Sequence, residues 1–278
     1  MTDKLQIQTD WMSEEDIILD EIQNRVLWLS MNMIHHVNAS YGKSGDPKVG
    51  GHQASSSSIV TIMTSLYFDY MRAGDLISVK PHASPVFHAI QFILGNLDKK
   101  YLTTLRRFHG LQAYPSRTKD PDKVDFSTGS VGLGAVAPNF AALTREYINS
   151  HINSNTRRDV RHISVLGDAE LDEGSVWEAI SEPAMSDISN VLWVVDLNRQ
   201  SLDRIIPGIR VKVWQDMMQA NGWNVIEAKY GKGLQKMFTE PHGELLRDSI
   251  DGMSNEMYQR LLRISSKDLR EWLPRTSE

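Results

Sequence analysis

A strand–helix–strand pattern in the middle of the chain most constrains its fold. Residues 161–166 and 191–197 are short apolar runs with β-branched residues, which predict two buried strands. Between them, residues 173–185 predict a helix, with Val176 and Ile180 on its apolar face. Strands joined by such a crossover run parallel in one sheet. The chain therefore predicts an α/β fold, a doubly wound parallel sheet flanked by helices.

A polar residue follows each predicted strand at the point where the strand ends. Asp168 follows the first strand and Asn198 follows the second. Open parallel sheets bind ligands along this carboxyl edge. A carboxylate and an amide oxygen there can bind a hard cation such as Mg²⁺, which keeps further positions for phosphate oxygens and water. The alternative is that Asp168 caps a helix and Asn198 shapes a turn, since both residue types favour these roles.

Composition excludes several classes of protein. The formal charge of −5 over 278 residues disfavours a broad nucleic-acid-binding surface. The chain has no cysteine, which excludes disulfides, thiolate metal sites and a cysteine nucleophile. No apolar run has the length of a membrane span, and the N-terminus lacks a signal peptide's apolar centre. We expect a cytoplasmic enzyme with one domain over residues 1–278, including an N-terminal arm over 1–12 and a helical tail over 231–278.

The remaining elements follow from periodicity and from breakers. Ser13 and Asp16 resemble a helix-opening capping pair. We expect further helices over residues 13–37, 56–71, 86–94, 98–108 and 211–220. The Gly-rich segment 127–134 is expected to open another helix, which runs to residue 149. We also expect a short strand over 75–80 and a third buried strand over 222–227.

Two further segments offer ligand-binding chemistry. Residues 50–55, Gly-Gly-His-Gln-Ala-Ser, precede a predicted helix, whose start offers free N–H donors to an anion. A serine-rich helix start without a ligand is the alternative. Lys80 precedes Pro81-His-Ala-Ser-Pro85. It either adds a positive charge beside a diphosphate or an acidic substrate, or is a solvated surface lysine.

Several of these segments together resemble one enzyme family, over roughly residues 20–265. The segments are Gly-Asp-Ala-Glu at 167–170, Asn-x-Gln-x-Leu-Asp at 198–203, Gly-Gly-His-x-Ala-Ser at 50–55, His-x-Ser-Pro at 82–85 and Gly-Trp-Asn-Val at 222–225. They resemble the homodimeric pyruvate dehydrogenase decarboxylating component and its transketolase relatives. The resemblance implies the fold of a thiamine-diphosphate-binding diphosphate domain, with thiamine diphosphate and Mg²⁺ as cofactors.

The resemblance also implies roles for individual residues. Asp168, Asn198 and the backbone carbonyl of Gln200 would bind Mg²⁺, and His52 and His82 would be catalytic. Ala169 stands where the family motif has its second glycine, which puts a methyl group beside the diphosphate. The full set of implied cofactor-binding residues is His52, Ser55, His82, Tyr114, Val131, Gly167, Asp168, Ala169, Glu170, Asn198 and Gln200.

The implied activity is decarboxylation of a 2-oxo acid such as pyruvate, followed by transfer of the acyl fragment. A lipoyl carrier is one acceptor that the resemblance implies for this fragment. Alternatives are a transketolase-like transfer of a two-carbon ketol or acyl unit and a non-catalytic scaffold subunit. In the family a separate pyrimidine-binding domain carries the glutamate that activates the cofactor, and Glu170, Asp172 and Glu173 do not correspond to it. We therefore expect a split subunit or a fragment, and the Met1 start favours a split subunit. We expect it to act with a pyrimidine-domain subunit in a heterotetramer. We expect neither nucleic-acid nor membrane partners.

Overall fold

The protein forms two compact units. The structure, a computed structural model, describes residues 12–41, 50–51, 53–129, 132–152, 160–197, 200–201, 204–205, 208–254, 257, 260–261 and 264–272. The larger unit is Met12–Asn198, and the smaller unit combines Met1–Trp11 with Arg199–Glu278. The single domain expected over residues 1–278 stays a prediction.

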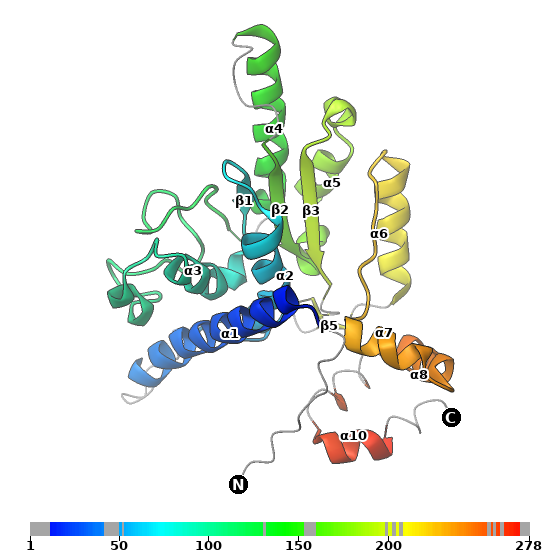
Figure 1. Cartoon of the computed structure of the whole chain (residues 1–278). Helices are drawn as coiled ribbons and strands as arrows, with labels where there is room; N and C mark the ends of the chain where they lie inside the picture. The colour runs from blue at the N-terminus through cyan, green and yellow to red at the C-terminus, as the bar shows by residue number, and fades with distance from the viewer. Residues whose placement is uncertain are drawn as a thin grey trace. The chain divides into compact units, whose positions relative to one another are not determined.

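A parallel three-stranded sheet is the centre of the larger unit (Figure 1). Its strands β1 (Leu76–Ser78), β2 (His162–Gly167) and β3 (Val191–Asp196) lie in the order β1-β2-β3. The central strand β2 is buried along its whole length. Burial on both faces explains its apolar residues Ile163, Val165 and Leu166. The two parallel strands predicted around residues 161–197 are confirmed, and β1 lies within the predicted range 75–80.

Helices and single helical turns surround this sheet. They are α1 (Glu14–Tyr41), α2 (Gln53–Ser65), the π-helical turn η1 (Leu66–Tyr70), η2 (Pro81–Ala83), α3 (Ser84–Ile93), η3 (Lys99–Thr103), α4 (Leu133–His151), η4 (Asp168–Asp172), α5 (Gly174–Ile180) and η5 (Pro183–Asp187). The expected opening of α1 is confirmed. Ser13 Oγ accepts the Asp16 N–H at 3.1 Å, and an Asp16 carboxylate oxygen accepts the Ser13 N–H at 3.0 Å.

Alternate residues of β2 face two different layers of helices. Ile163 and Val165 belong to a buried apolar cluster that also contains residues of α1, α2 and α3. Ser164, which lies between them, donates from Oγ to the carbonyl of Ala135 in α4 at 2.9 Å. Successive side chains of a strand point to opposite faces, so the sheet has helices on both sides. This confirms the predicted α/β class with helices flanking a parallel sheet.

Two predicted helices are wrong in extent. The helix expected over 173–185 ends at Ile180 and is followed by the separate turn η5. Pro183 explains the break, because proline lacks an N–H and disfavours helical geometry at the residue before it. The helix expected over 98–108 is only the turn η3, and the chain then reaches a positive φ of 59° at Arg106. A left-handed residue cannot continue a right-handed helix.

The smaller unit is mainly helical. Its elements are the antiparallel pair β4 (Gln200–Ser201) and β5 (Arg204–Ile205), followed by α6 (Gly208–Ala220), α7 (Lys232–Thr239), α8 (Gly243–Asp251) and α10 (Ser266–Trp272). The helical tail expected over 231–278 agrees with α7, α8 and α10 in its described part.

The third strand, expected over 222–227, is wrong. Within the described structure this segment pairs with no strand, and Ile226 is 84% exposed. A strand is stable only when its backbone groups pair with a neighbour, and the apolar sequence of this segment has none here.

Among the described residues, no helix combines the length and apolar character that crossing a membrane would need. The cytoplasmic location stays a prediction.

Candidate functional site

Charged side chains from all three strands of the larger unit meet at the carboxyl edge of the sheet. Asp196 is the last residue of β3 and pairs in register with Gly167, the last residue of β2. Asp168 follows directly, and Lys80 follows β1 by two residues. Because the strands are parallel, these positions lie on one edge. We refer to Lys80, Asp168, Glu170 and Asp196 as the edge cluster.

A buried ion pair connects β1 to β3 across this edge. Lys80 Nζ lies 2.6 Å from Asp196 Oδ2, and the two side chains are only 5% and 7% exposed. Ser58 Oγ of α2 donates to the same oxygen at 2.6 Å. The stem of Lys80 passes over Gly167, where a β-carbon would lie 3.5 Å from its Cδ. The alternative of a solvated surface lysine at Lys80 is therefore wrong.

Asp168 is a buried carboxylate with one unused oxygen. The residue is 1% exposed, and Oδ1 accepts the N–H of Ala169 at 3.0 Å. Oδ2 is buried and has no hydrogen-bond partner. Burial raises the pKa of Asp168 to about 6; the charge of Asp196 adds to the rise, while the Ala169 N–H and Lys80 oppose it. A cation bound at Oδ2 would satisfy this oxygen.

Glu170 turns back toward the end of β2. Its Oε2 accepts the N–H of Gly167 at 2.9 Å, and its Oε1 is buried without a partner. Burial raises the pKa of Glu170 to about 7, with the Gly167 N–H and Lys80 working against the rise. The edge cluster thus has three carboxyl groups and one ammonium group, so with its carboxylates ionised it carries excess negative charge.

Ala169 fits the backbone at its position. It lies in the turn η4, and it is not among the residues of positive φ. A glycine is needed where φ is positive or where no space is left for a β-carbon. The backbone at residue 169 therefore accepts alanine without strain.

Two glycines of the Gly-rich segment at 127–134 pack closely against neighbouring side chains. Gly132 has a φ of 74°, and a β-carbon there would lie 2.9 Å from Val176 Cγ2 of α5. A β-carbon on Gly134 would lie 3.1 Å from Ser78 Oγ at the end of β1. The start of α4 therefore lies against β1 near the edge cluster.

Other predicted site residues lie on elements beside the edge. His82 is in η2, two residues after Lys80, and its ring makes an edge-to-face contact with Tyr114 at 5.5 Å between centroids. Ser84 Oγ donates to the carbonyl of Ala113 at 2.9 Å, which fixes the backbone next to Tyr114. Ser55 lies in the first turn of α2.

The structure brings some predicted residues together and leaves others undescribed. It places Gly167, Asp168, Ala169, Glu170 and His82 at or beside the end of the sheet. His52, Val131 and Asn198 lie outside the described residues, and of Gln200 only the backbone, in β4, is described.

Sequence reasoning missed Asp196 and Ser58. An aspartate that ends an apolar run is a detectable signal for Asp196, because an isolated charge in a buried strand requires a partner. Ser58 lies one helical turn after Ser55, so both are on the same face of α2.

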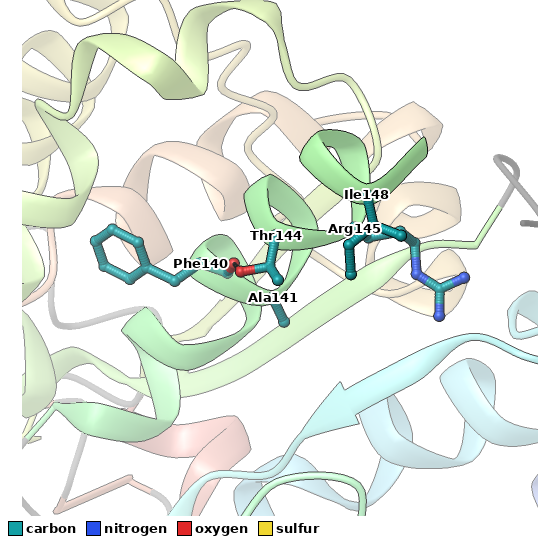
Figure 2. Close-up of a pocket in the computed structure, with 5 residues that line it drawn as sticks. All are labelled: Phe140, Ala141, Thr144, Arg145 and Ile148. Carbon is teal, nitrogen blue, oxygen red and sulfur yellow. Dashed lines mark hydrogen bonds between the residues drawn. The ribbon is translucent and has the colours of Figure 1, made fainter. Parts of the chain in front are cut away.

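A surface hollow on α4 is separate from the edge cluster. Figure 2 shows its five lining side chains, Phe140, Ala141, Thr144, Arg145 and Ile148. All five belong to α4, and none is a predicted site residue. The hollow therefore contains no part of the predicted site.

The fold and this edge define a parallel α/β domain with a buried acidic site at the carboxyl ends of its strands. Residues 67–240 match the family described as the transketolase, thiamine diphosphate binding domain. The match includes β1, β2, β3 and the whole edge cluster, and it covers more than half of the chain. The chain belongs to this family.

Similar proteins agree with this assignment. The pyruvate dehydrogenase E1 component of Escherichia coli K12 is 28% identical over 222 residues, which are 74% of this chain and 25% of that protein. Transketolase-like protein 2 of Mus musculus is 29% identical over 219 residues, 74% of this chain and 32% of that protein. The structure of transketolase from Leishmania mexicana superposes with a TM-score of 0.62 at 19% identity, over 76% of this chain and 32% of that one. The chain thus spans about a quarter to a third of the length of these proteins.

The buried ion pair gives the first prediction. Lys80→Met should lower the free energy of unfolding by on the order of 3 kcal/mol, because Asp196 then stays buried without its cation. The double variant Lys80→Met/Asp196→Leu should cost less than Lys80→Met alone, since both charges are removed. Urea unfolding measures both values.

Lys100→Met is the matched control, because Lys100 forms an exposed ion pair with Asp98. It should leave the unfolding free energy unchanged within error. Equal losses for Lys80→Met and Lys100→Met would show that the Lys80–Asp196 pair does not stabilise the edge.

The raised carboxyl pKa values give a pH dependence. In the folded chain the pKa of Asp168 is about 6 and that of Glu170 about 7, above the unfolded values of 3.8 and 4.5. The folded state therefore binds these protons more tightly, and their contribution is present near pH 4 and lost as the pH rises through 6 to 7. The loss is about 3 kcal/mol for each group.

Urea unfolding between pH 4 and pH 8, in buffer with a chelator, tests this dependence. Asp168→Asn and Glu170→Gln should each flatten the decline relative to the parent chain. Identical pH profiles for the parent and both variants would contradict the burial of these carboxyl groups.

Proposed function

We propose that this chain binds the diphosphate end of thiamine diphosphate together with Mg²⁺, as part of a thiamine-diphosphate-dependent enzyme. One observation carries the proposal: the buried Oδ2 of Asp168 has no protein partner, at a sheet edge inside the segment that matches the family. An ionised carboxylate in such a position favours a bound cation.

The donor atoms suit the proposed metal. Asp168, Asn198 and the carbonyl of Gln200 would supply three oxygen ligands, and Mg²⁺ prefers oxygen ligands and keeps some positions for phosphate and water. The negative excess of the edge cluster supports a divalent cation there. Ala169 does not oppose this, because its backbone conformation accepts a side chain.

The protein would contribute positioning and electrostatics. Ser58 and Lys80 hold Asp196 in place, so the ends of β1 and β3 are fixed relative to Asp168. His82, fixed against Tyr114, would donate to phosphate or substrate oxygens or transfer protons. The bound cofactor would supply the electron sink for cleaving the bond next to a carbonyl group.

We place the reaction as decarboxylation of a 2-oxo acid such as pyruvate, with acyl transfer, a lipoyl carrier being one acceptor. The similarity to pyruvate dehydrogenase E1 components supports this choice. The proposal includes a pyrimidine-domain subunit, which would supply the rest of the site as the resemblance to the family implies. The proposed assembly is a cytoplasmic heterotetramer with two copies of each chain.

A transketolase-like transfer of a two-carbon unit is the second candidate. The likeness to the mouse transketolase-like protein favours it. A scaffold subunit without catalysis is the third candidate. It is favoured by Lys80, because this side chain already places a positive charge at the sheet edge.

The metal assignment gives a binding prediction. Thiamine diphosphate should bind only with Mg²⁺ or a similar divalent cation once the assembly is complete. Asp168→Ala and Asn198→Ala should each abolish that binding with little loss of folding, because each removes a metal ligand. Calorimetry with and without Mg²⁺ measures the affinity.

Asp172→Ala is the matched control for Asp168→Ala, since Asp172 is an exposed carboxylate on the same turn η4. It should bind the cofactor as the parent chain does. Undiminished affinity in both Asp168→Ala and Asn198→Ala would exclude the proposed metal ligands.

The catalytic assignment gives a prediction on turnover. With its partner, His82→Ala should lower kcat by on the order of 100-fold while cofactor affinity changes far less, because His82 would act on charge in the transition state. His151→Ala, on the exposed end of α4, should leave both unchanged. Pyruvate decarboxylation is the assay.

This chain alone should show no turnover, since the activating glutamate comes from the partner. Substantial activity of the chain alone would refute the need for a partner. Normal turnover of the assembled His82→Ala variant would refute the catalytic role of His82. If the assembly transfers a ketol unit without decarboxylation, the transketolase-like candidate is supported. If it is inactive with both 2-oxo acids and ketoses, the scaffold candidate is supported.

A further inference from the structure

A second buried polar cluster lies outside the edge cluster. It consists of His88 on α3 and of Asp120 and Asp122 in the segment between η3 and α4. The three side chains are fully buried or nearly so, and each can place one donor atom within 4.8 Å of the others. We call this group the His88 cluster.

The imidazole of His88 is held between the two carboxylates. Its Nδ1 lies 2.7 Å from Asp122 Oδ2, a hydrogen-bond distance, and its Nε2 lies 4.0 Å from Asp120 Oδ1. Nε2 has no hydrogen-bond partner, and neither has Asp122 Oδ1, although both atoms are buried. Buried polar atoms without partners are rare in folded proteins, and they indicate a missing ligand, water or ion.

The charges of the cluster are also uncompensated. Two ionised carboxylates and one imidazole leave a net charge of −2 or −1, depending on whether the imidazole is neutral or protonated. Asp120 accepts backbone N–H groups of Gln112 and Ser116, at 2.8 and 2.7 Å, but these carry no net charge. Within the described chain, neither carboxylate has an ion-pair partner other than His88. A buried charge of this size is relieved by a bound cation or by protonation of a carboxyl group, and burial raises the pKa of Asp120.

We propose that the His88 cluster is a binding site for a divalent transition metal of the zinc class, with His88 Nε2 and Asp120 Oδ1 as ligands. The two atoms lie 4.0 Å apart, wider than the roughly 3.3 Å between two ligands of a tetrahedral ion, so metal binding would draw His88 and Asp120 together by about 0.7 Å. Asp122 accepts the Nδ1 proton and thereby directs the lone pair of Nε2 toward Asp120, as carboxylates do behind metal-bound histidines. A nitrogen ligand favours zinc-like ions over Mg²⁺ or Ca²⁺.

The site would be structural. The metal would tie the segment that contains Gln112, Tyr114 and Asp120 to α3, next to the hydrogen bond from Ser84 to Ala113. It would thus stabilise the backbone that carries Tyr114. The proposal stands on the His88 cluster alone and does not depend on thiamine diphosphate binding.

The test is metal binding by the full chain, refolded with Zn²⁺ or Co²⁺ in excess Mg²⁺, which saturates all-oxygen sites. One equivalent of metal should remain after gel filtration, and Co²⁺ should give visible absorption bands. His88→Gln should weaken binding more than 100-fold, and Asp122→Asn by about 10- to 100-fold. His151→Gln, which removes an exposed histidine, should bind as the parent chain does.

If circular dichroism shows that His88→Gln does not fold, Asp122→Asn and the Zn²⁺-dependence of the parent's Tm decide. The Tm of the parent chain should rise with Zn²⁺, and that of Asp122→Asn should rise less. Any of three results would overturn the proposal. The first is that no stoichiometric metal binds, and the second is that the parent chain and Asp122→Asn bind metal equally. The third is that nitrogen NMR signals show both ring nitrogens of His88 protonated with Zn²⁺ present.

Discussion

Burial of negative charge at the end of a parallel sheet is the constraint on which the rest of this site depends. Asp168 and Asp196 are almost fully enclosed, yet only Asp196 has a cation, Lys80, within contact. The remaining oxygen of Asp168 has no protein partner. A protein interior tolerates such a group only when it is protonated or when a cation binds to it. The site is thus chemically incomplete by itself, as a binding site for a charged ligand would be.

The fold produces this enclosure by simple means. Parallel pairing brings the ends of β1, β2 and β3 to one edge, and the crossover α5 returns the chain so that β3 can lie beside β2. Helices on both faces exclude water from β2, and the close packing of Gly132 and Gly134 seats the start of α4 beside β1. Burial then shifts the carboxyl pKa values, so the topology sets the chemistry of the edge.

Much of this arrangement could be predicted from the sequence because it follows from local signals. Apolar runs and helical periodicity indicated the parallel strands, and the resemblance at 167–170 indicated Asp168 and Glu170. The inward direction of Lys80 could not be predicted, because a lysine is usually solvated and only the position of Asp196 reverses that preference. Ser58 was missed for the same reason, since its partner is distant in sequence.

The errors have the same physical origin. Gly222–Glu227 has the composition of a strand, but composition does not supply a neighbouring strand to pair with. Pro183 divided one predicted helix, and a left-handed residue at Arg106 limited another to a single turn. The His88 cluster left no periodic signal at all, because its members come from a helix and from an irregular segment.

The most direct test of this account is the position of the metal in crystals of the assembled protein grown with thiamine diphosphate and Mn²⁺ in place of Mg²⁺. Anomalous scattering locates Mn²⁺ independently of any assumption about its ligands. The account predicts a peak within coordination distance of Asp168 Oδ2, at the carboxyl edge of β2. Bound cofactor with its Mn²⁺ peak elsewhere, or with Asp168 paired to a protein group instead, would contradict it.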